Sequence, residues 1–232
     1  CVEVWCQAHA VVNGRPVKSI NQYYNKHKAE LQSKLEHTGT TKRTERLTNI
    51  RTRRIDNYMH TTSKRIIDLL VKEGIGMLVI GKNNGWKQKA KMGTRTNQNF
   101  VQVPHARLIS MLSYKAELVG IKVKLTEESY TSKASFLDDD DIPVYDPKQK
   151  EKPKFSGKRI KRGLYQAADG RIINADVNGA YNIIRKVAPK ALRAEGVEDG
   201  KREATPLVVH PVRIVVLRTK LKNEVVKQTH IF

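Results

Sequence analysis

Three carboxylates stand at the ends of elements that the sequence predicts, where they could bind metal ions. Glu127 and Glu128 directly follow an alternating apolar run at 121–125, and Asp176 stands where a polar turn enters a predicted final helix. Carboxylates that converge from different elements can hold two Mg²⁺ ions about 4 Å apart, one activating a water molecule and the other stabilising the leaving oxygen. The alternatives are that Asp176 is a plain N-cap and that both glutamates are solvated charges at a strand end.

The elements that would position these residues form a strand–loop–helix–strand unit. Residues 77–80 are a continuous apolar run, as expected for a central buried strand. A polar and basic loop at 82–99 follows, then a helix from Pro104 to about Leu118, and then the strand at 121–125. This order predicts a βαβ unit, which is normally a right-handed parallel crossover.

Two long amphipathic helices precede this unit. Apolar residues recur at three- and four-residue spacing over 19–37 and again over 45–73. Ser19 is the predicted N-cap of the first helix, and Gly39 lies just past its end. Because only a short polar turn joins the two helices, we expect a helical hairpin at about 18–73.

The other predicted elements are a strand at 1–13, a β-hairpin at 164–173, a helix at about 176–187 and a strand at 207–217. Asp169-Gly170 is the expected turn of the β-hairpin. Residues 138–162 consist of an acidic run followed by a basic one and contain few apolar side chains. We expect them to form an exposed insertion or a mobile arm.

The composition narrows the class of protein. The chain has 232 residues, 44 Lys and Arg against 23 Asp and Glu, and a formal net charge of +21. Such an excess points to a polyanionic partner, most often nucleic acid, whose binding weakens steeply with salt. No run of 18 apolar residues exists for a membrane helix and no secretory signal opens the chain. Two cysteines exclude a disulfide scaffold and a four-cysteine zinc site, and favour a cytoplasmic protein.

One constellation of residues carries a family resemblance. Tyr130-Thr131-Ser132 follows the two glutamates, and about 40 residues later comes an Asp-x-Asn-x-Ala-x-Asn sequence from Asp176 to Asn182. In this order and spacing, the chain resembles the C-terminal half of the TnpB (OrfB) family of transposon-encoded proteins. These proteins are relatives of type V CRISPR effectors and of the eukaryotic Fanzor proteins. The resemblance covers nearly the whole chain.

The resemblance implies an α/β fold of the RNase H-like (RuvC-like) kind, with a mixed sheet. Its core would comprise 1–133, with the long helical hairpin inserted, and 171–232, with a zinc-ribbon-like insertion at 134–170 between them. The implied activity is RNA-guided cleavage of DNA with Mg²⁺ or Mn²⁺. The implied partners are DNA and a guide RNA, and the implied location is the cytoplasm, at the nucleoid.

Two departures concern the catalytic carboxylates. The family's first ligand, an Asp in an Asp-Leu-Gly strand, has no counterpart before the helical hairpin, and the chain begins with Cys1 rather than Met, which indicates a fragment, a processed product or a truncated reading frame. The family's second ligand is a Glu at the end of the central strand, where this chain has Gly81. Fanzor-like relatives carry this Glu displaced to just before the Tyr-Thr-Ser segment. By resemblance, Glu128 takes that place, with Glu127 as the alternative, and Asp176 is the other catalytic metal ligand.

A third departure concerns zinc. Where the resemblance expects two Cys-x-x-Cys pairs, the chain has Ser135 with Asp138 and Gln166 with Asp169. A structural zinc ion requires thiolate or imidazole ligands. We therefore expect a degenerate ribbon that binds no zinc.

Basic residues cluster in the second long helix, in the loop after residue 81 and in the arm before the β-hairpin. The predicted contacts to nucleic acid are Arg46, Arg53, Arg54, Lys82, Trp86, Lys87, Arg95, Lys158, Arg159, Lys161 and Arg162. Trp86 and Tyr165 are aromatic residues among charges that could stack on bases, although each alone is more often core or surface.

Three functional hypotheses follow. The first is the RuvC-like nuclease part of a TnpB-family protein, incomplete as given. The second is a truncated or nuclease-dead derivative that binds DNA or RNA without cutting, which the absent Asp and Gly81 favour. The third is a ribosomal-type RNA-binding protein, which accounts for the charge but not for the two motifs.

Overall fold

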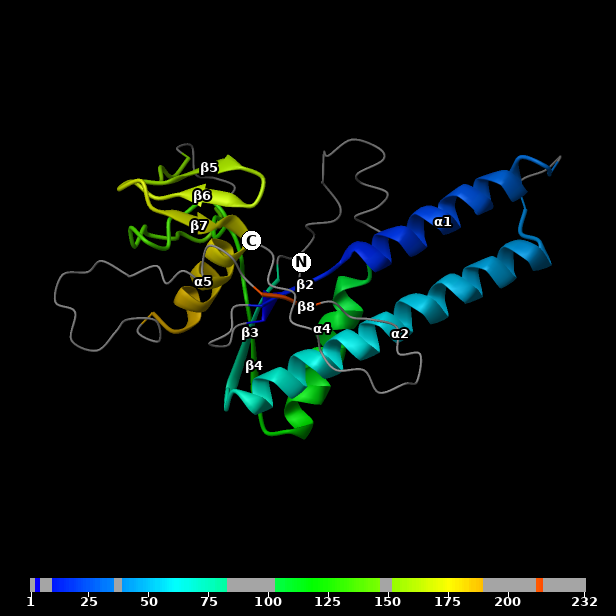
Figure 1. Cartoon of the computed structure of the whole chain (residues 1–232), viewed down its shortest axis with the longest axis horizontal. Coiled ribbons are helices and arrows are strands. Elements are labelled where there is room, and N and C mark those ends of the chain that lie inside the picture. The colour runs from blue at the N-terminus through cyan, green and yellow to red at the C-terminus, as the bar shows by residue number, and fades with distance from the viewer. Residues whose placement is uncertain are drawn as a thin grey trace.

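The computed structural model describes residues 3–4, 10–35, 39–82, 103–146, 152–189 and 212–214. Three predicted nucleic-acid contacts, Trp86, Lys87 and Arg95, lie outside these ranges. Figure 1 shows two long helices that extend side by side to one end of the molecule, while a small sheet and the last helix lie at the other end. Among the described helices, none combines the length and the apolar character needed to span a bilayer.

The two long helices are α1 (Arg15–Gln32) and α2 (Lys42–Lys72). The helix α1 begins four residues before the predicted N-cap Ser19, because Pro16 in its first turn has the backbone angle of a helix and needs no hydrogen-bond partner for its nitrogen. It ends at Gln32, and so the prediction of Gly39 as the end was also wrong. The start of α2 is fixed by Thr41, which exchanges hydrogen bonds with Thr44 in a capping box.

The predicted strand–helix–strand unit is present as β3 (Met77–Gly81), α4 (His105–Leu118) and β4 (Lys122–Thr126). The two strands are parallel, with Ile80 opposite Leu125 and Gly81 opposite Thr126. Only Leu78 of β3 is fully buried, and so the expectation of a central buried strand was too strong. Among the described residues β3 pairs only with β4, and part of its surface therefore stays open.

The described strands form three small sheets rather than one. The N-terminal sheet joins β1 (Glu3–Val4), β2 (Ala10–Val12) and β8 (Val212–Ile214), with β2 and β8 parallel. The third sheet is antiparallel, in the order β5 (Lys158–Lys161), β6 (Leu164–Gln166) and β7 (Ile172–Asn174). The predicted turn at Asp169-Gly170 connects β6 and β7, and Gly170 has the positive φ of 86° that such a turn uses.

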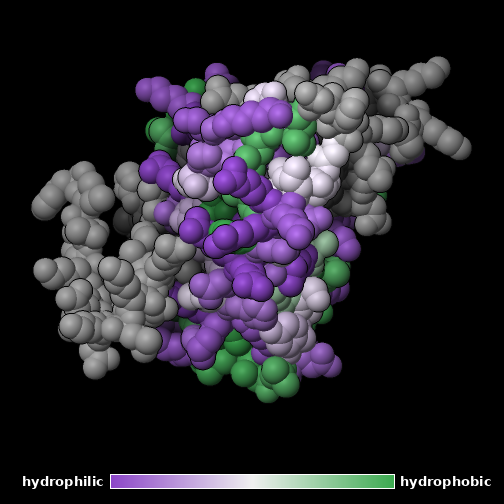
Figure 2. Space-filling model, turned by 90° about the vertical axis from the view of Figure 1, so that its right-hand side faces the viewer, coloured by the Kyte–Doolittle hydropathy of each residue, from purple (hydrophilic) through white to green (hydrophobic). Residues whose placement is uncertain are grey.

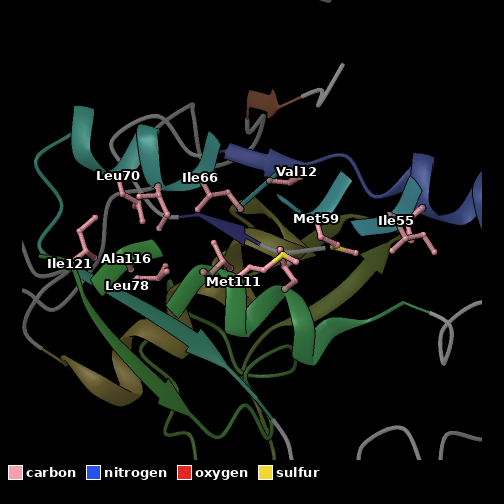
Figure 3. Close-up of a cluster of buried hydrophobic side chains, with 13 residues drawn as sticks. Val12, Ile55, Met59, Ile66, Leu70, Leu78, Met111, Ala116 and Ile121 are labelled. Carbon is pink, nitrogen blue, oxygen red and sulfur yellow. The ribbon is translucent and has the colours of Figure 1, made fainter. Parts of the chain in front are cut away.

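The larger hydrophobic core lies between α2, α4 and the β3–β4 pair, and Figure 3 shows its side chains meeting from these elements. Ile66, Leu70 and Leu112 are at most 1% exposed. Removing a side chain of this size from water contributes about 1.5–3 kcal/mol each. This core holds β3 and β4 in place, and with them the residues at their carboxyl ends.

A second, smaller core packs the third sheet against α5 (Ala175–Val187). It joins Phe136 and Leu137 to Tyr165 of β6, Ile173 of β7 and Tyr181 of α5. Tyr165 is only 1% exposed, and its hydroxyl donates to the Lys133 carbonyl at 2.7 Å. The suggestion that Tyr165 stacks on bases was therefore wrong: it is a core residue.

Candidate functional site

The carboxyl end of β3 and the first residues after β4 meet at Gly81 and Glu128. A Cβ atom placed on Gly81 would lie 2.8 Å from Glu128 Oε2 and 3.1 Å from Glu128 Cβ. It would also lie 2.8 Å from Cδ1 of Ile183 on α5. A Cβ atom is essentially never found within 3.0 Å of such neighbours, and so a side chain at position 81 would require Glu128 or Ile183 to shift. Gly81 therefore leaves the space in which the Glu128 carboxylate lies.

Glu128 is half-buried, and this has an electrostatic consequence. Burial raises the pKa of the Glu128 carboxyl above its ordinary value, and the neighbouring Glu127 raises it further. Lys186 acts in the opposite direction and lowers the same pKa. A carboxylate that is costly to ionise in the folded chain is a candidate functional group, since a bound cation would remove that cost.

Glu127 has other partners. Its Oε2 atom lies 2.7 Å from Nζ of Lys186, and its Oε1 atom accepts a hydrogen bond of 2.6 Å from the Ser129 amide. Lys186 also donates to the Ser129 carbonyl at 2.9 Å. Glu127 is therefore engaged in fixing the turn that follows β4.

Asp176 lies in the first turn of α5, but it is not the cap. The Oδ1 atom of Asn174 accepts hydrogen bonds from the amides of Asp176 and Val177, at 2.9 and 3.2 Å. The Asp176 carboxylate is 44% exposed and lies 3.8 Å from the Arg159 guanidinium on β5. Because Asn174 performs the capping, the alternative reading of Asp176 as a plain N-cap was wrong.

The two asparagines of the motif fasten α5 to the turn that follows Glu128. Asn182 donates to the carbonyls of Thr131 and Ala134, at 2.9 and 2.7 Å. Asn178 donates to the same Ala134 carbonyl at 2.8 Å and accepts from the Phe136 amide at 2.9 Å. Both asparagines are fully buried. From the sequence, these asparagines were recognised only as part of a motif. Their spacing of four residues on the apolar face of a helix is the signal that predicts buried, hydrogen-bonded side chains.

The turn itself closes on Glu128. The Thr131 hydroxyl donates to the Glu128 carbonyl at 2.8 Å, and the Thr131 amide donates to the same oxygen at 3.3 Å. The Tyr-Thr-Ser segment thus fixes the backbone of Glu128 on one side and is bound by Asn182 on the other. This arrangement sets the position of Glu128 relative to α5.

Asp176 and Ile183 lie on the same face of α5. Ile183, whose side chain borders Gly81 and Glu128, follows Asp176 by seven residues, or two helical turns, which is about 10 Å along the axis. Within the described ranges, no three His, Cys, Asp or Glu side chains lie close enough to hold a metal ion. Carboxylate oxygens are the donor type that suits a hard cation such as Mg²⁺.

The ribbon segment at 134–170 is held by hydrogen bonds that include Ser135 and Asp138, two of the positions where the resemblance expects cysteines. The Asp138 amide donates to Oγ of Ser135 at 3.3 Å, and the Asp138 carboxylate accepts from the Ala168 amide at 2.9 Å. The Asp140 carboxylate accepts from the Ser135 amide at 2.7 Å and from the Ser156 hydroxyl at 2.6 Å. These hydroxyl and carboxylate groups already have partners and include no thiolate or imidazole, and so they do not fit zinc.

The acidic run was predicted as part of an exposed insertion or a mobile arm, and Asp139 and Asp141 are indeed exposed, although Asp139 and Asp140 also bind a buried side chain. Arg185 of α5 is 8% exposed and donates to the Asp139 carboxylate and to the Asp140 carbonyl. Nothing in the local sequence indicates this pairing, because 45 or more residues separate the partners.

The basic residues predicted to contact nucleic acid are exposed wherever the structure describes them: Arg46, Arg53, Arg54, Lys82, Lys158, Arg159, Lys161 and Arg162. Arg46 and Arg53 line a shallow hollow on the first half of α2, with Lys42, Glu45, Asn49 and Ile50. Figure 2, which views the molecule from the side of the α1–α2 tip, shows a largely hydrophilic surface where residues are described. These positions are compatible with phosphate contacts.

Comparisons with known proteins divide the chain into two matched segments. The family model OrfB_IS605, described as "Probable transposase", matches residues 4–87. The family model Cas12f1-like, TNB domain, matches residues 105–183. No curated protein matches the chain. Among solved structures, the chain is similar to one titled "Cryo-EM structure of the Cas12f1-sgRNA-target DNA complex", with 18% identity and a TM-score of 0.48. That match covers 71% of this chain and 40% of the other, and so this chain spans less than half the length of that protein.

Proposed function

We propose that this chain forms the nuclease part of a transposon-associated protein that cuts DNA along a guide RNA. The two matched segments support a TnpB-like protein. The proposal includes an RNase H-like fold with α1 and α2 as an inserted hairpin, and the division of the chain at 1–133, 134–170 and 171–232. It also includes a cytoplasmic location at the nucleoid, which follows from the DNA substrate.

The observation that carries the proposal is the position of Glu128 over Gly81. In the resembled family a Glu ends the central strand, and here the same space is filled by a Glu from the end of the adjacent strand. The segment that bears Glu128 is fastened to α5 by Asn178 and Asn182. A carboxylate is thus kept at the carboxyl end of β3 although the residue in the strand is glycine.

Glu128 and Asp176 are the residues that would hold Mg²⁺ or Mn²⁺, with carboxylate oxygens as ligands. When bound, such ions make a water molecule a better nucleophile and stabilise the leaving oxygen. Glu128 is half-buried and the pKa of its carboxyl is raised, so that a metal ion would compete with a proton for this carboxylate. Arg159, which faces Asp176, is placed to meet a phosphate of the substrate once Asp176 binds a cation.

A second candidate function is a nucleic-acid-binding derivative that does not cut. It is supported by Gly81, because β3 itself carries no carboxylate at the position where the resembled family has a Glu. Both functions use the same basic surface, and metal binding is the property that separates them.

Calorimetric titration of the chain with Mn²⁺ at low salt tests the proposal. We expect binding that is weakened at least tenfold by Glu128→Gln or Asp176→Asn and abolished in the double variant. Glu117→Gln, a change on the exposed surface of α4, is the matched control and should bind as the unmodified chain does. If the unmodified chain binds no Mn²⁺, the nuclease proposal fails for this chain and the binding-only function remains.

A further inference from the structure

Three aromatic side chains meet at the surface beside Glu128. Tyr130 comes from the turn after Glu128, Tyr145 from the irregular segment at 140–146, and Phe155 from the segment that leads into β5. The ring of Tyr130 lies 6.3 Å from that of Tyr145 and 5.9 Å from that of Phe155, with tilts of 48° and 42°. We call these three residues the aromatic platform.

Tyr145 is the open member of the aromatic platform, and Tyr130 and Phe155 are half-buried beside it. Tyr145 is 59% exposed and the preceding Val144 is 70% exposed. By contrast, Phe136 and Tyr181 stack at 4.3 Å and are only 5% and 4% exposed. An exposed group of large apolar side chains loses the benefit of burial, and a partner that covers it would restore that benefit.

Tyr130 is also held in an uncommon backbone conformation. Its φ is +61°, in the left-handed region that a bulky residue rarely adopts. The conformation is held by the amides of Lys133 and Ala134, which donate to the Tyr130 carbonyl at 2.8 and 2.9 Å. Strained backbone that the surroundings maintain is concentrated at functional sites. The ring of Tyr130 contacts those of Tyr145 and Phe155.

Positive charge borders the aromatic platform. Lys152 and Lys154 are exposed on either side of Pro153 and directly precede Phe155, and Lys158 and Arg159 follow in β5. The acidic neighbours are Asp141 and Asp146, on the segment that bears Tyr145. Basic side chains alternating with open aromatic rings are the combination that binds single-stranded nucleic acid, the charges along the backbone and the rings against the bases.

We propose that Tyr130, Tyr145 and Phe155 form a stacking platform for the bases of a single-stranded nucleic acid. The inference rests on the proposed function and names a substrate subsite for it. The platform is linked along the chain to both candidate ligands: Tyr130 is two residues beyond Glu128, and Phe155 is four residues before Arg159, which lies 3.8 Å from Asp176. A strand whose bases stack here would have its phosphates near both carboxylates. A duplex offers no free base faces and would not use the platform.

The test measures binding of fluorescein-labelled dT15, rU15 and a 15-base-pair duplex in low-salt buffer with EDTA. We expect Tyr145→Ala to weaken binding of one or both single strands about 5- to 100-fold, with the salt dependence unchanged. Tyr145→Phe should keep the affinity of the unmodified chain, and Tyr145→Ala should leave duplex binding unchanged. Lys154→Gln should instead lower the salt slope by about 0.7 for a single strand. The difference between dT15 and rU15 shows whether DNA or RNA is the preferred strand.

The matched control is Tyr23→Ala, since Tyr23 is a 54% exposed tyrosine on α1, far along the chain from the platform. An oligonucleotide with an internal 2-aminopurine adds a direct readout, because its fluorescence falls when the base stacks. The fall should occur with the unmodified chain and with Tyr145→Phe, and be lost with Tyr145→Ala. Single-strand affinity within twofold of the unmodified chain for Tyr145→Ala, or an equal loss for Tyr23→Ala, would overturn the proposal. Because EDTA removes metal, this result is independent of the Mn²⁺ titration.

Discussion

Glu128 Oε2 lies 2.8 Å from the position that a Cβ atom on Gly81 would occupy, and so the two residues share one space at the carboxyl end of β3. The strand supplies the space and the residue after the neighbouring strand supplies the carboxylate. The parallel pairing of β3 with β4, in which Gly81 is opposite Thr126, brings the two chain segments together at this point. A glycine where a catalytic acid is expected is therefore compatible with an acidic site.

Replacing Glu128 with glutamine should stabilise the metal-free chain at neutral pH. A carboxyl whose pKa is higher in the folded chain than in the unfolded chain favours folding while it is protonated, below its ordinary pKa of 4.5. That stability is lost as the pH rises through the raised pKa. Thermal unfolding in EDTA should give a higher Tm for Glu128→Gln at pH 7–8 and no difference near pH 4. A lower Tm for the variant at pH 8 would contradict the burial of this carboxylate.

Replacing Asn182 with alanine should cost about 2–4 kcal/mol of unfolding free energy. The change removes two hydrogen bonds and leaves the buried carbonyls of Thr131 and Ala134 without this donor. Asn49→Ala, at an exposed position of α2, is the control and should change stability by less than about 0.5 kcal/mol. Urea unfolding measures both. Equal effects of the two changes would mean that Asn182 does not fasten the turn.

Replacing Gly157 with alanine should destabilise the third sheet by about 1–3 kcal/mol. A Cβ atom there would lie 2.6 Å from a ring carbon of Tyr165 and 2.7 Å from the Gln166 carbonyl. The carbonyl belongs to the backbone and cannot move without disturbing β6. Gly76→Ala has no atom within 4 Å of its added carbon and serves as the control. Urea unfolding in which the two alanine variants are equally stable would show that the contact is not tight.

The ribbon segment should fold without zinc. Asp140→Asn, which keeps one oxygen but loses the charge that receives the Ser135 and Ser156 donors, should lower stability by about 1–2 kcal/mol. The neighbouring exposed Asp141→Asn should have little effect. Addition of Zn²⁺ or EDTA should leave the Tm of the unmodified chain unchanged. A fall in Tm on EDTA treatment would show that a metal, and not the hydrogen bonds, holds this segment.

Local patterns were enough to predict the elements that carry the site. Apolar periodicity gave α2 and α4 within three residues at their starts, and the order of strand, helix and strand gave the parallel pairing of β3 and β4. The predicted start of α1 at Ser19 was four residues late, because Pro16 already stands in the first turn of the helix. The starts of these helices and the pairing of these strands depend on residues that are close in the sequence, and so they can be predicted from it.

Tertiary contacts were not accessible in the same way. Nothing near Arg185 in the sequence indicates that it pairs with Asp139, and nothing near Asp140 indicates that its carboxylate receives the amide and hydroxyl of Ser156. Tyr165 was considered for stacking because basic residues flank it, whereas its place in the antiparallel sheet turns the ring into the smaller core. Such contacts depend on how α5 and the third sheet pack, which no single segment specifies.

The most direct test of the shared space is an exchange of the two residues. Gly81→Glu alone should collide with Glu128, and Glu128→Gly alone should weaken Mn²⁺ binding at least tenfold. The double variant, Gly81→Glu with Glu128→Gly, puts the carboxylate on the strand and removes the Glu128 side chain, so that only the flexible end of Ile183 has to move aside. Calorimetric titration with Mn²⁺ should then recover affinity to within about fivefold of the unmodified chain. If the double variant binds Mn²⁺ no better than Glu128→Gly alone, Glu128 does not stand in for a carboxylate at position 81 and the central claim is contradicted.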